Sequence, residues 1–377
     1  MSRTVTQIGI DSHGAERDGE GNATYTRNLL TALLNEPAAE RFVLFAGDAG
    51  HPFYRHLLGG RASTVAVTQG GGIARLGWSL ARAARRQSID ALHVQYAGPL
   101  GYRRPLVVTV HDLSFLHYPE SFPRGLRLAL RVLVPRTIAR AARVIAVSEF
   151  TRQDIIARYG TAPDKVRAIS ESAGIGFHPM PAARTAEVLA RYGVTPGFVF
   201  SLGRLNRRKN LERLIVAHAR VLAEGETDAP LVVGGKPDHG FPDTLRAVTR
   251  SGTDRVRWVG LIPDADLPYF FSGAACFVYP SLFEGFGLPV LEAMSCGTPV
   301  VTSDRTALPE LAGDAGLLVD PESVDALTEA IRRVLTDESL AAELGRRGLE
   351  RSRRFSWSET ARRTLTVYRE ALGQAAA

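Results

Sequence analysis

Two glutamates separated by a glycine-rich turn and a helix start are the most informative chemical groups in the sequence. In the segment 276–301, CFVYPSLFEGFGLPVLEAMSCGTPVV, a strand-like run ends near Pro280, and Glu284 lies in the turn that follows. Pro289 suits a first helical turn, which would place Glu292 about one turn into the helix. Amides at a helix N-terminus bind phosphate, and glycines allow close backbone approach. Two carboxylates beside such an anion site suit a ligand that also carries hydroxyl groups, although an ordinary turn with surface glutamates is the alternative.

A basic cluster follows another strand-like run, in the segment 198–214, FVFSLGRLNRRKNLERL. We expect the strand to end at Gly203, with Arg204 and Lys209 in the loop before a helix that opens near Asn210. Cations beside a diphosphate can stabilise a departing nucleoside diphosphate by charge. The cluster by itself could equally be a solvated turn. At the same sheet edge as the glutamates, it favours a functional site.

A histidine ends a third strand-like run, in VVTVHDLSFLHYP. His111 would occupy a loop position at the carboxyl end of a buried strand, where parallel sheets bind ligands. A single histidine is more often structural than catalytic. Its neighbour Asp112 could orient the ring or cap a turn.

A glycine-containing loop follows the first strand-like run and opens a predicted helix, in the segment 19–30, GEGNATYTRNLL. Backbone amides near Gly21 and Asn22 could reach a phosphate. The segment lacks the GxGxxG spacing, so it does not support a dinucleotide-dependent oxidoreductase.

Neither the histidines, the cysteines nor the one DxD triplet predicts a metal site. The nine histidines are scattered, and Cys276 and Cys296, the only cysteines, lie in apolar contexts that predict buried thiols. The triplet at Asp264 to Asp266 resembles a metal-binding acidic pair, but its position favours the cap of a short helix. No metal or other cofactor is expected.

The pattern of apolar runs predicts an α/β protein with two doubly wound parallel sheets. The 377 residues suffice for two domains, and segments with helical spacing separate many of the runs. The segment 174–196, rich in glycine and proline, is the best linker candidate, and we place the domain boundary at residue 180. Strand-like runs occur at 5–11, 41–47, 63–68, 91–96, 105–112, 143–148, 197–203, 230–235, 256–260, 276–281, 299–304 and 316–320. Helical spacing occurs at 25–34, 76–86, 125–140, 211–223 and 288–294.

The positive charge is concentrated in the first half of the chain. Residues 1–180 carry 22 basic and 14 acidic side chains, whereas residues 181–377 carry 24 and 25. Because no run of about 18 apolar residues occurs, the default expectation is a cytoplasmic protein. The basic half suggests peripheral contact with the inner face of a membrane, and no nucleic acid is expected as a partner. The arginines that would make this contact alternate with leucines and are Arg124, Arg127, Arg131, Arg136, Arg140 and Arg143.

The chain resembles retaining glycosyltransferase family 4 along nearly its whole length, and within the family it is most similar to the mannosyltransferases of polysaccharide assembly. The resemblance implies a GT-B fold, in which two Rossmann-like domains face each other across a cleft that holds a nucleotide-sugar donor. It assigns residues 1–180 to the acceptor-side domain, 181–355 to the donor domain and 356–377 to a helix that returns to the first domain. It is carried by GNATYTRNLL, VTVHDLSFLHYPESF, VIAVSEFTRQDI, GRLNRRKNLERLI, VRWVGLIPDADL and EGFGLPVLEAMSCGTPVV.

The resemblance also assigns roles to individual residues. Arg204 and Lys209 would bind the donor diphosphate, Glu284 the hexose and Glu292 the ribose, while His111 would lie near the transferred sugar. Many family members have a second glycine where this chain has Ala23, which weakens the expected phosphate contact of that loop. The implied catalytic residues are His111, Glu284, Arg204 and Lys209. The implied donor-binding residues are Gly21, Asn22, Gly203, Arg204, Lys209, Gly260, Leu261, Glu284, Gly285, Phe286, Gly287, Leu288 and Glu292.

The expected reaction is transfer of a hexose, with retention, to a saccharide, lipid-linked or small-molecule acceptor. The mechanism implied is front-face displacement by positioning and charge, with Glu284 as a covalent nucleophile the weaker alternative. GDP-mannose is the favoured donor, and UDP or dTDP sugars fit the same residues. The competing enzyme class is a nucleotide-sugar epimerase of the same fold; a phosphorylase is disfavoured because none of the three lysines has a suitable apolar setting for pyridoxal. The competing class without catalysis is a nucleic-acid or membrane-binding module.

Overall fold

The chain forms two compact units, each described here by itself. The computed structural model describes residues 5–17, 21–57, 59–67, 78–236 and 255–374. Residues 19, 20, 68, 76 and 77, which fall within three segments discussed above, lie outside this description. Unit 1 comprises Met1–Leu116, Arg124–Glu171 and Ser356–Ala377, and unit 2 comprises His117–Pro123 and Ser172–Phe355.

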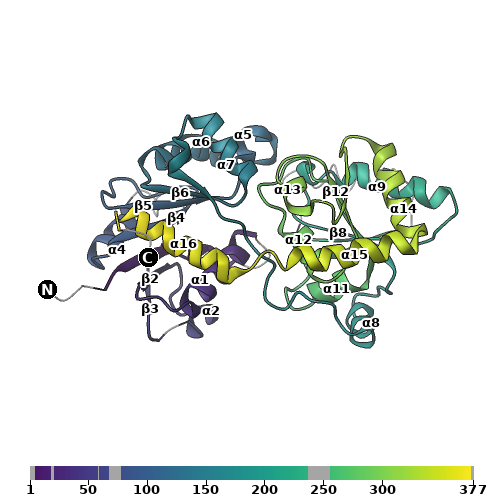
Figure 1. The fold of residues 1–377 in the computed structure, drawn as a ribbon, viewed down its shortest axis with the longest axis horizontal. Helices are drawn as coiled ribbons and strands as arrows, with labels where there is room; N and C mark the ends of the chain where they lie inside the picture. The colour runs from purple at the N-terminus through teal and green to yellow at the C-terminus, as the bar shows by residue number, and fades with distance from the viewer. Residues whose placement is uncertain (1–4, 18–20, 58, 68–77, 237–254, 375–377) are drawn as a thin grey trace. The chain divides into compact units, whose positions relative to one another are not determined.

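Unit 1 is built on a parallel sheet with the strand order β3-β2-β1-β4-β5-β6-β7 (Figure 1). The strand order changes direction between β1 and β4. Sheets of this kind bind ligands at such a point. The strands are β1 Gln7–Asp11, β2 Arg41–Ala46, β3 Ala62–Ala66, β4 Ala91–Gln95, β5 Leu106–Val110, β6 Arg143–Ala146 and β7 Val166–Ala168. The helices that join them are α1 Gly21–Asn35, α2 Pro52–Arg55, α4 Leu80–Arg86, α5 Ser114–His117, α6 Arg124–Arg140 and α7 Glu149–Tyr159.

Unit 2 repeats the plan with the strand order β10-β9-β8-β11-β12-β13, again wholly parallel. The reversal here lies between β8 and β11. The strands are β8 Phe198–Leu202, β9 Leu231–Gly234, β10 Val256–Gly260, β11 Ala274–Tyr279, β12 Val300–Ser303 and β13 Leu317–Val319. The helices are α8 Ala182–Ala190, α9 Leu211–Ala223, α11 Leu267–Gly273, α12 Leu288–Ser295, α13 Leu308–Ala312, α14 Val324–Thr336 and α15 Glu338–Ser352.

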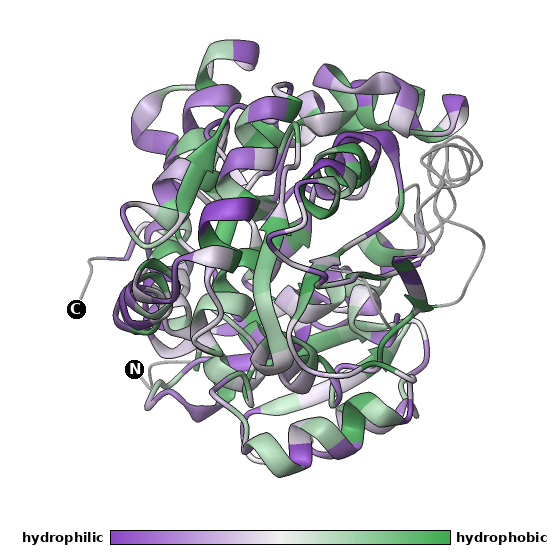
Figure 2. Ribbon diagram, turned by 90° about the vertical axis from the view of Figure 1, so that its right-hand side faces the viewer, coloured by the Kyte–Doolittle hydropathy of each residue, from purple (hydrophilic) through white to green (hydrophobic). Residues whose placement is uncertain are grey.

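Both faces of the unit 2 sheet are buried because successive side chains of a strand point to opposite faces. Phe198 and Phe200 of β8 and Phe277 of β11 form an aromatic cluster with the two phenylalanines of α11. Val199 and Val278, which alternate with them, belong to an aliphatic cluster with residues of α9 and α14. Figure 2 shows the result, with strongly hydrophobic strands and helices that carry both hydrophobic and hydrophilic residues. The near-continuous apolar runs therefore form sheets covered by helices on two sides.

The prediction of a linker at residues 174–196 is wrong, because most of this segment belongs to unit 2. Residues 182–190 form α8, which packs against α11, and Met180 N donates to Ser272 Oγ at 3.1 Å. The chain passes between the units at Glu171 and Ser172, before the boundary placed at residue 180. The short segment 117–123 also groups with unit 2, although it lies within the range expected for the first domain.

The last helix, α16 (Trp357–Ala371), belongs to unit 1, where Figure 1 shows it in yellow beside α1. A buried polar network ties it to the sheet: His93 Nδ1 lies 2.7 Å from Tyr368 Oη, and His93 Nε2 lies 2.8 Å from Thr109 Oγ1. Tyr25 Oη of α1 completes the network at 3.1 Å from the same threonine oxygen. Burial, followed by the nearby His111, lowers the pKa of His93 from 6.5 to about 3.

We predict that His93 makes unit 1 sensitive to acid. Below pH 6.5 His93 is protonated in the unfolded chain but stays neutral in the folded unit. The free energy of unfolding therefore falls as the pH drops from 6.5 towards 3. In His93→Gln, the loss of unfolding free energy between pH 7 and pH 4 should be smaller than in the wild type by roughly 2 to 3 kcal/mol. Urea unfolding across this range measures it, with the exposed His178→Gln as the matched control. Equal slopes for His93→Gln and the wild type would contradict the prediction.

Candidate functional site

The carboxyl ends of β8 and β11 bring the basic cluster and the first glutamate together in unit 2. The two strands are neighbours in the sheet, and Leu282 N donates to Arg208 O at 2.9 Å across the loops that follow them. Lys209 Nζ lies 2.6 Å from Glu284 Oε1, and Arg208 Nη1 lies 3.0 Å from the same oxygen. The side chains of Arg208 and Lys209 are only 12% and 11% exposed, so they do not form a solvated turn.

The Glu284 carboxylate is buried and receives four donors on one oxygen. Besides the two cations, Tyr279 Oη donates to Oε1 at 3.0 Å and Ser281 Oγ at 2.5 Å. Lys209 Nζ also donates to Tyr279 Oη, and it lies over the tyrosine ring at 4.8 Å from the centroid. All four contacts to the carboxylate end on Oε1, so the group is held in one orientation by a rigid charged cluster.

The charges of this cluster decide the ionisation of Glu284. Burial opposes ionisation, but the charges of Arg208 and Lys209 and the hydrogen bonds from Lys209 and Ser281 outweigh it and lower the pKa of Glu284 to about 2. Burial, and next the charge of Glu284, raises the pKa of Tyr279 well above its usual value. Glu284 is therefore a carboxylate and Tyr279 a hydrogen-bond donor at neutral pH.

The glycine-rich turn leads into α12 as the sequence predicts. Gly287 precedes the helix with φ +110°, and a Cβ there would lie 2.7 Å from Leu308 Cδ2, so no other residue fits without rearrangement. Pro289 occupies the first turn, and Glu292 is buried one turn into the helix. The segment from Gly285 to Leu288, expected to bind the donor through its amides, thus lies at a helix N-terminus.

Two non-glycine residues with left-handed backbone support this cluster. Asn210, at φ +59°, follows Lys209 and donates from Nδ2 to Pro280 O at 3.0 Å and to Pro321 O at 2.6 Å. Thr306, at φ +61°, accepts on Oγ1 from Glu284 N at 3.1 Å. Non-glycine residues adopt this conformation where the surrounding structure enforces it, and such positions are frequent at functional sites.

The remaining unit 2 residues of the expected site lie at the ends of β8 and β10. Gly203 directly follows β8, and its carbonyl oxygen would lie only 1.8 Å from a Cβ at Gly235, so these two strand ends approach more closely than any side chain would allow. Arg204 is exposed in the next position. Gly260 ends β10 with φ +70°, and Leu261 after it is half exposed.

In unit 1, His111 lies at the carboxyl end of β5 and both of its ring nitrogens are engaged. Nδ1 lies 3.0 Å from Glu171 Oε1, and Nε2 lies 2.8 Å from Gln95 Oε1 at the end of β4. Of the two roles considered for Asp112, the structure supports the cap: its Oδ1 accepts from Ser114 N at 2.9 Å, where α5 begins. Glu171, and not Asp112, is the carboxylate that orients the ring.

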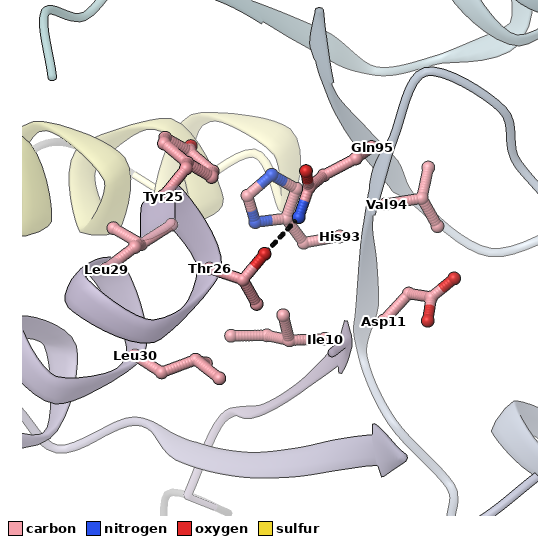
Figure 3. A pocket seen from close by; sticks show the side chains of 9 residues that line it. All are labelled: Ile10, Asp11, Tyr25, Thr26, Leu29, Leu30, His93, Val94 and Gln95. Atoms are coloured by element: carbon pink, nitrogen blue, oxygen red, sulfur yellow. Dashed lines mark hydrogen bonds between the residues drawn. The ribbon is translucent and has the colours of Figure 1, made fainter. Parts of the chain in front are cut away.

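The expected phosphate-binding loop of unit 1 is the first turn of α1, because the helix begins at Gly21. Thr26 Oγ1 donates to Asn22 O at 2.6 Å and accepts from Gln95 Nε2 at 2.6 Å. Figure 3 shows Thr26 and Gln95 facing each other beside a small cavity of about 10 Å³, which also borders His93 and Tyr25. The first turn of α1 is thus connected to the end of β4.

The acidic triplet has a role that its position alone did not reveal. Asp266 occupies the N-cap position of α11, but its side chain makes no capping bond and accepts instead from Arg191 Nη2 at 2.9 Å and Tyr192 Oη at 2.6 Å.

Cys276 and Cys296 are buried free thiols, as predicted. Within the described residues, no three His, Cys, Asp or Glu side chains gather as a metal site would require. No helix in this part of the chain is long and apolar enough to cross a membrane.

Sequence reasoning assigned no role to five residues that surround Glu284 and His111. Tyr279 and Ser281 flank Pro280 in the quoted glycine-loop segment, and a polar residue at a strand end was the available signal. Arg208 lies in the basic cluster that the sequence pointed to, but it was given no role there. Nothing local marks Gln95 and Glu171, because each meets His111 across strands that are distant in sequence. The five residues are Gln95, Glu171, Arg208, Tyr279 and Ser281.

We predict that Lys209→Met destabilises unit 2 by about 1 to 3 kcal/mol at pH 7, because Glu284 then keeps only Arg208 as a charged partner. The depressed pKa of Glu284 contributes stability above pH 4.5 that is lost as the pH falls towards 2, so the gap between variant and wild type should narrow on acidification. Urea unfolding at pH 7 and pH 3 measures this. Lys165→Met, which removes only an exposed bond to Ala139 O, is the control. If the difference in unfolding free energy between Lys209→Met and the wild type stays constant with pH, the pairing of Lys209 with Glu284 is refuted.

Comparison with known proteins identifies the family. Residues 191–351 match the model for glycosyl transferases group 1, and residues 20–171 match the model for glycosyltransferase family 4. The O-antigen chain mannosyltransferase B of Escherichia coli is 35% identical over 70% of this chain and 70% of its own length. Among solved structures, sucrose-phosphate synthase from Thermosynechococcus elongatus matches with a TM-score of 0.78 at 24% identity, covering 98% of this chain and 99% of that one. Anabaena HepE in complex with UDP-glucose matches with a TM-score of 0.72 at 22% identity, covering 96% and 99%. The chain therefore belongs to glycosyltransferase family 4 and is a glycosyltransferase with the GT-B fold.

Proposed function

We propose that the protein transfers a hexose, with retention, from a nucleotide-diphosphate sugar to a saccharide or lipid-linked saccharide, and that GDP-mannose is the donor. The observation that carries the proposal is the Glu284 cluster at the N-terminus of α12. A fixed carboxylate, two cations and a helix N-terminus together suit a ligand that is both anionic and rich in hydroxyl groups.

Each part of the cluster has a place in this proposal. The second carboxylate oxygen of Glu284 accepts from a hexose hydroxyl, while Oε1 is taken up by the four donors. Arg204, Lys209 and the amides from Gly285 to Leu288 bind the diphosphate. Glu292 accepts from the ribose hydroxyls, and the backbone near Gly260 holds the base. In unit 1, the residues proposed to contact the donor are His111 and the first turn of α1.

The proposed mechanism is displacement on one face of the sugar. The bond from the anomeric carbon to the diphosphate oxygen breaks, the acceptor oxygen bonds to the same face, and the acceptor proton moves to the departing diphosphate. Positive groups beside the diphosphate stabilise the charge that develops as it leaves. Glu284 suits positioning better than covalent attack, because the four donors on Oε1 lower its basicity.

The preference for mannose rests on similarity. The E. coli relative of 35% identity is named a mannosyltransferase, whereas the HepE structure of 22% identity contains UDP-glucose. The more similar protein therefore favours GDP-mannose, and a UDP sugar is the alternative. Base selection rests largely on backbone contacts, so the base is best identified directly by binding.

We predict that GDP, but not UDP, dTDP or ADP, raises the melting temperature. At a concentration of a hundred times Kd the shift should be roughly 5 to 10 °C, and EDTA should leave it unchanged. Glu292→Ala should lose the shift, whereas Glu338→Ala, which changes an exposed glutamate in the first turn of α15, should keep it. A shift with UDP alone would replace GDP by UDP as the base, and no shift with any nucleotide would overturn the proposed donor site.

The surface of α6 supports the proposal of a lipid-linked acceptor. Between Ser121 and Ser148 the chain carries six arginines and no acidic residue. In the first half of α6, Leu126 and Leu128 are 50% and 66% exposed and Val132 is 39% exposed. Leucines exposed among arginines fit the interface of an anionic bilayer, where the apolar side chains enter the lipid and the guanidinium groups meet the phosphates.

We predict that the protein binds vesicles containing phosphatidylglycerol and not vesicles of phosphatidylcholine alone. Leu128→Ser combined with Val132→Ser should weaken this binding by roughly tenfold, since burial of each apolar side chain contributes on the order of 1 kcal/mol. Sedimentation with vesicles at low and high salt is the measurement. The control pair is Val216→Ser with Leu318→Ser, two exposed apolar residues of unit 2. Equal binding of the two double variants would exclude α6 as the contact.

A further inference from the structure

The hydrogen bonds around His111 form a chain whose proton directions are fixed by the last link. Thr26 Oγ1 has one proton, and Asn22 O, a carbonyl that can only accept, lies 2.6 Å from it. The threonine oxygen must therefore accept from its other neighbour, which lies 2.6 Å away and is the amide nitrogen of Gln95 (Figure 3). The amide orientation of Gln95 follows from this.

With the nitrogen of Gln95 turned to Thr26, its oxygen faces His111. Gln95 Oε1 can only accept, so His111 Nε2, at 2.8 Å, carries a proton and donates it. On the other side of the ring, Glu171 Oε1 lies 3.0 Å from Nδ1, and a carboxylate also accepts. One proton therefore lies between Nδ1 and Glu171. When the ring nitrogen holds it, both ring nitrogens donate, and an imidazole with two protons is a cation.

The surroundings of the ring fit a cation held by one carboxylate. The Glu171 side chain is 4% exposed, and a buried carboxylate needs a positive partner. Tyr25 and Tyr96 place their rings 4.7 and 5.6 Å from the imidazole. Other titratable groups near the ring include His93, which burial keeps neutral, and Asp112, which is bonded to Ser114.

The backbone around both partners is fixed from elsewhere in unit 1. Thr360 Oγ1 of α16 donates to Ser170 O at 2.8 Å, directly before Glu171. Thr151 Oγ1 of α7 donates to His111 O at 3.3 Å. Tyr96 follows β4 with a left-handed φ of +58°, a strained conformation for a tyrosine that places its ring against His111.

We infer that Glu171 is a positioning residue that, together with Gln95, holds His111 as an imidazolium cation, so that His111 serves the transfer reaction as a charged donor and not as a base. The inference rests on the proposed function for its catalytic meaning. The group that His111 meets must then be an acceptor, such as a phosphate oxygen of the donor or a hydroxyl oxygen of the sugar. Its charge would stabilise a departing diphosphate.

The first experiment measures the proton count on His111 directly and needs no substrate. Nitrogen NMR of 15N-histidine protein at pH 8, with His111→Gln for assignment, distinguishes a ring with two protons from a neutral one. At this pH a histidine with the ordinary pKa of about 6.5 is mostly neutral. We expect two protonated nitrogens on His111 in the wild type and in Glu40→Gln, which alters another buried carboxylate of unit 1, paired with Arg369. We expect a neutral ring in Glu171→Gln. A neutral ring in the wild type, or a cation that survives in Glu171→Gln, would overturn the inference.

The second experiment connects the cation to transfer. Glu171→Gln should lower kcat on the order of a hundredfold while the KM for the donor changes less, because the charge acts on the leaving group. Glu171→Asp, which retains the negative charge, should recover part of kcat, and Glu40→Gln should resemble the wild type. An unchanged kcat in Glu171→Gln would remove the catalytic role. If the wild type transfers no sugar from any nucleotide, the proposed function fails, while the NMR result still decides the state of His111.

Discussion

A buried carboxylate needs hydrogen-bond donors or a positive partner, and this requirement shapes the carboxyl edge of the sheet in both units. Glu284 is surrounded by Arg208 and Lys209 in unit 2, and Glu171 is paired with His111 in unit 1. Removing an ion from water is costly, so such a pair persists only where good geometry and further hydrogen bonds offset that penalty. In both places the pair lies where parallel strands end and the loops begin. The ion pairs and hydrogen bonds of these carboxylates hold the loops in place.

Backbone strain marks the same two places. Of the four non-glycine residues with positive φ in the described chain, Tyr96 lies against His111, and Asn210 and Thr306 support the Glu284 cluster. Strained residues are retained where the surroundings over-determine them. Here they contact the side chains and backbone of the two clusters at strand ends. Rigid placement of charge before a ligand arrives is what charge-stabilised transfer requires, because little reorganisation is then needed during the reaction.

Much of the fold could be predicted from the sequence because its signals are local. Near-continuous apolar runs predict buried parallel strands, and every strand of the two sheets except the short β7 coincides with one of them. The start of α12 was readable from Gly287 and Pro289, and the end of β5 from the position of His111. The prediction of a linker failed because glycine and proline also occur in compact structure. Residues 182–190 form a helix that packs on α11. Composition alone does not distinguish a passage between units from a short loop within one.

The sequence by itself determined which residue types stand at the strand ends, and with them the family and the class of chemistry. It also determined that Glu284, Glu292, Lys209 and His111 would lie in loops or first helical turns, because that depends on residues a few positions away. Only the tertiary structure decided which groups meet. Arg208 is a buried partner of Glu284 and not a solvated side chain, and Glu171, which lies 60 residues from His111, replaces Asp112 as the carboxylate beside it. The physical reason is that pairing of buried charges depends on the order of strands in a sheet, which no local pattern encodes.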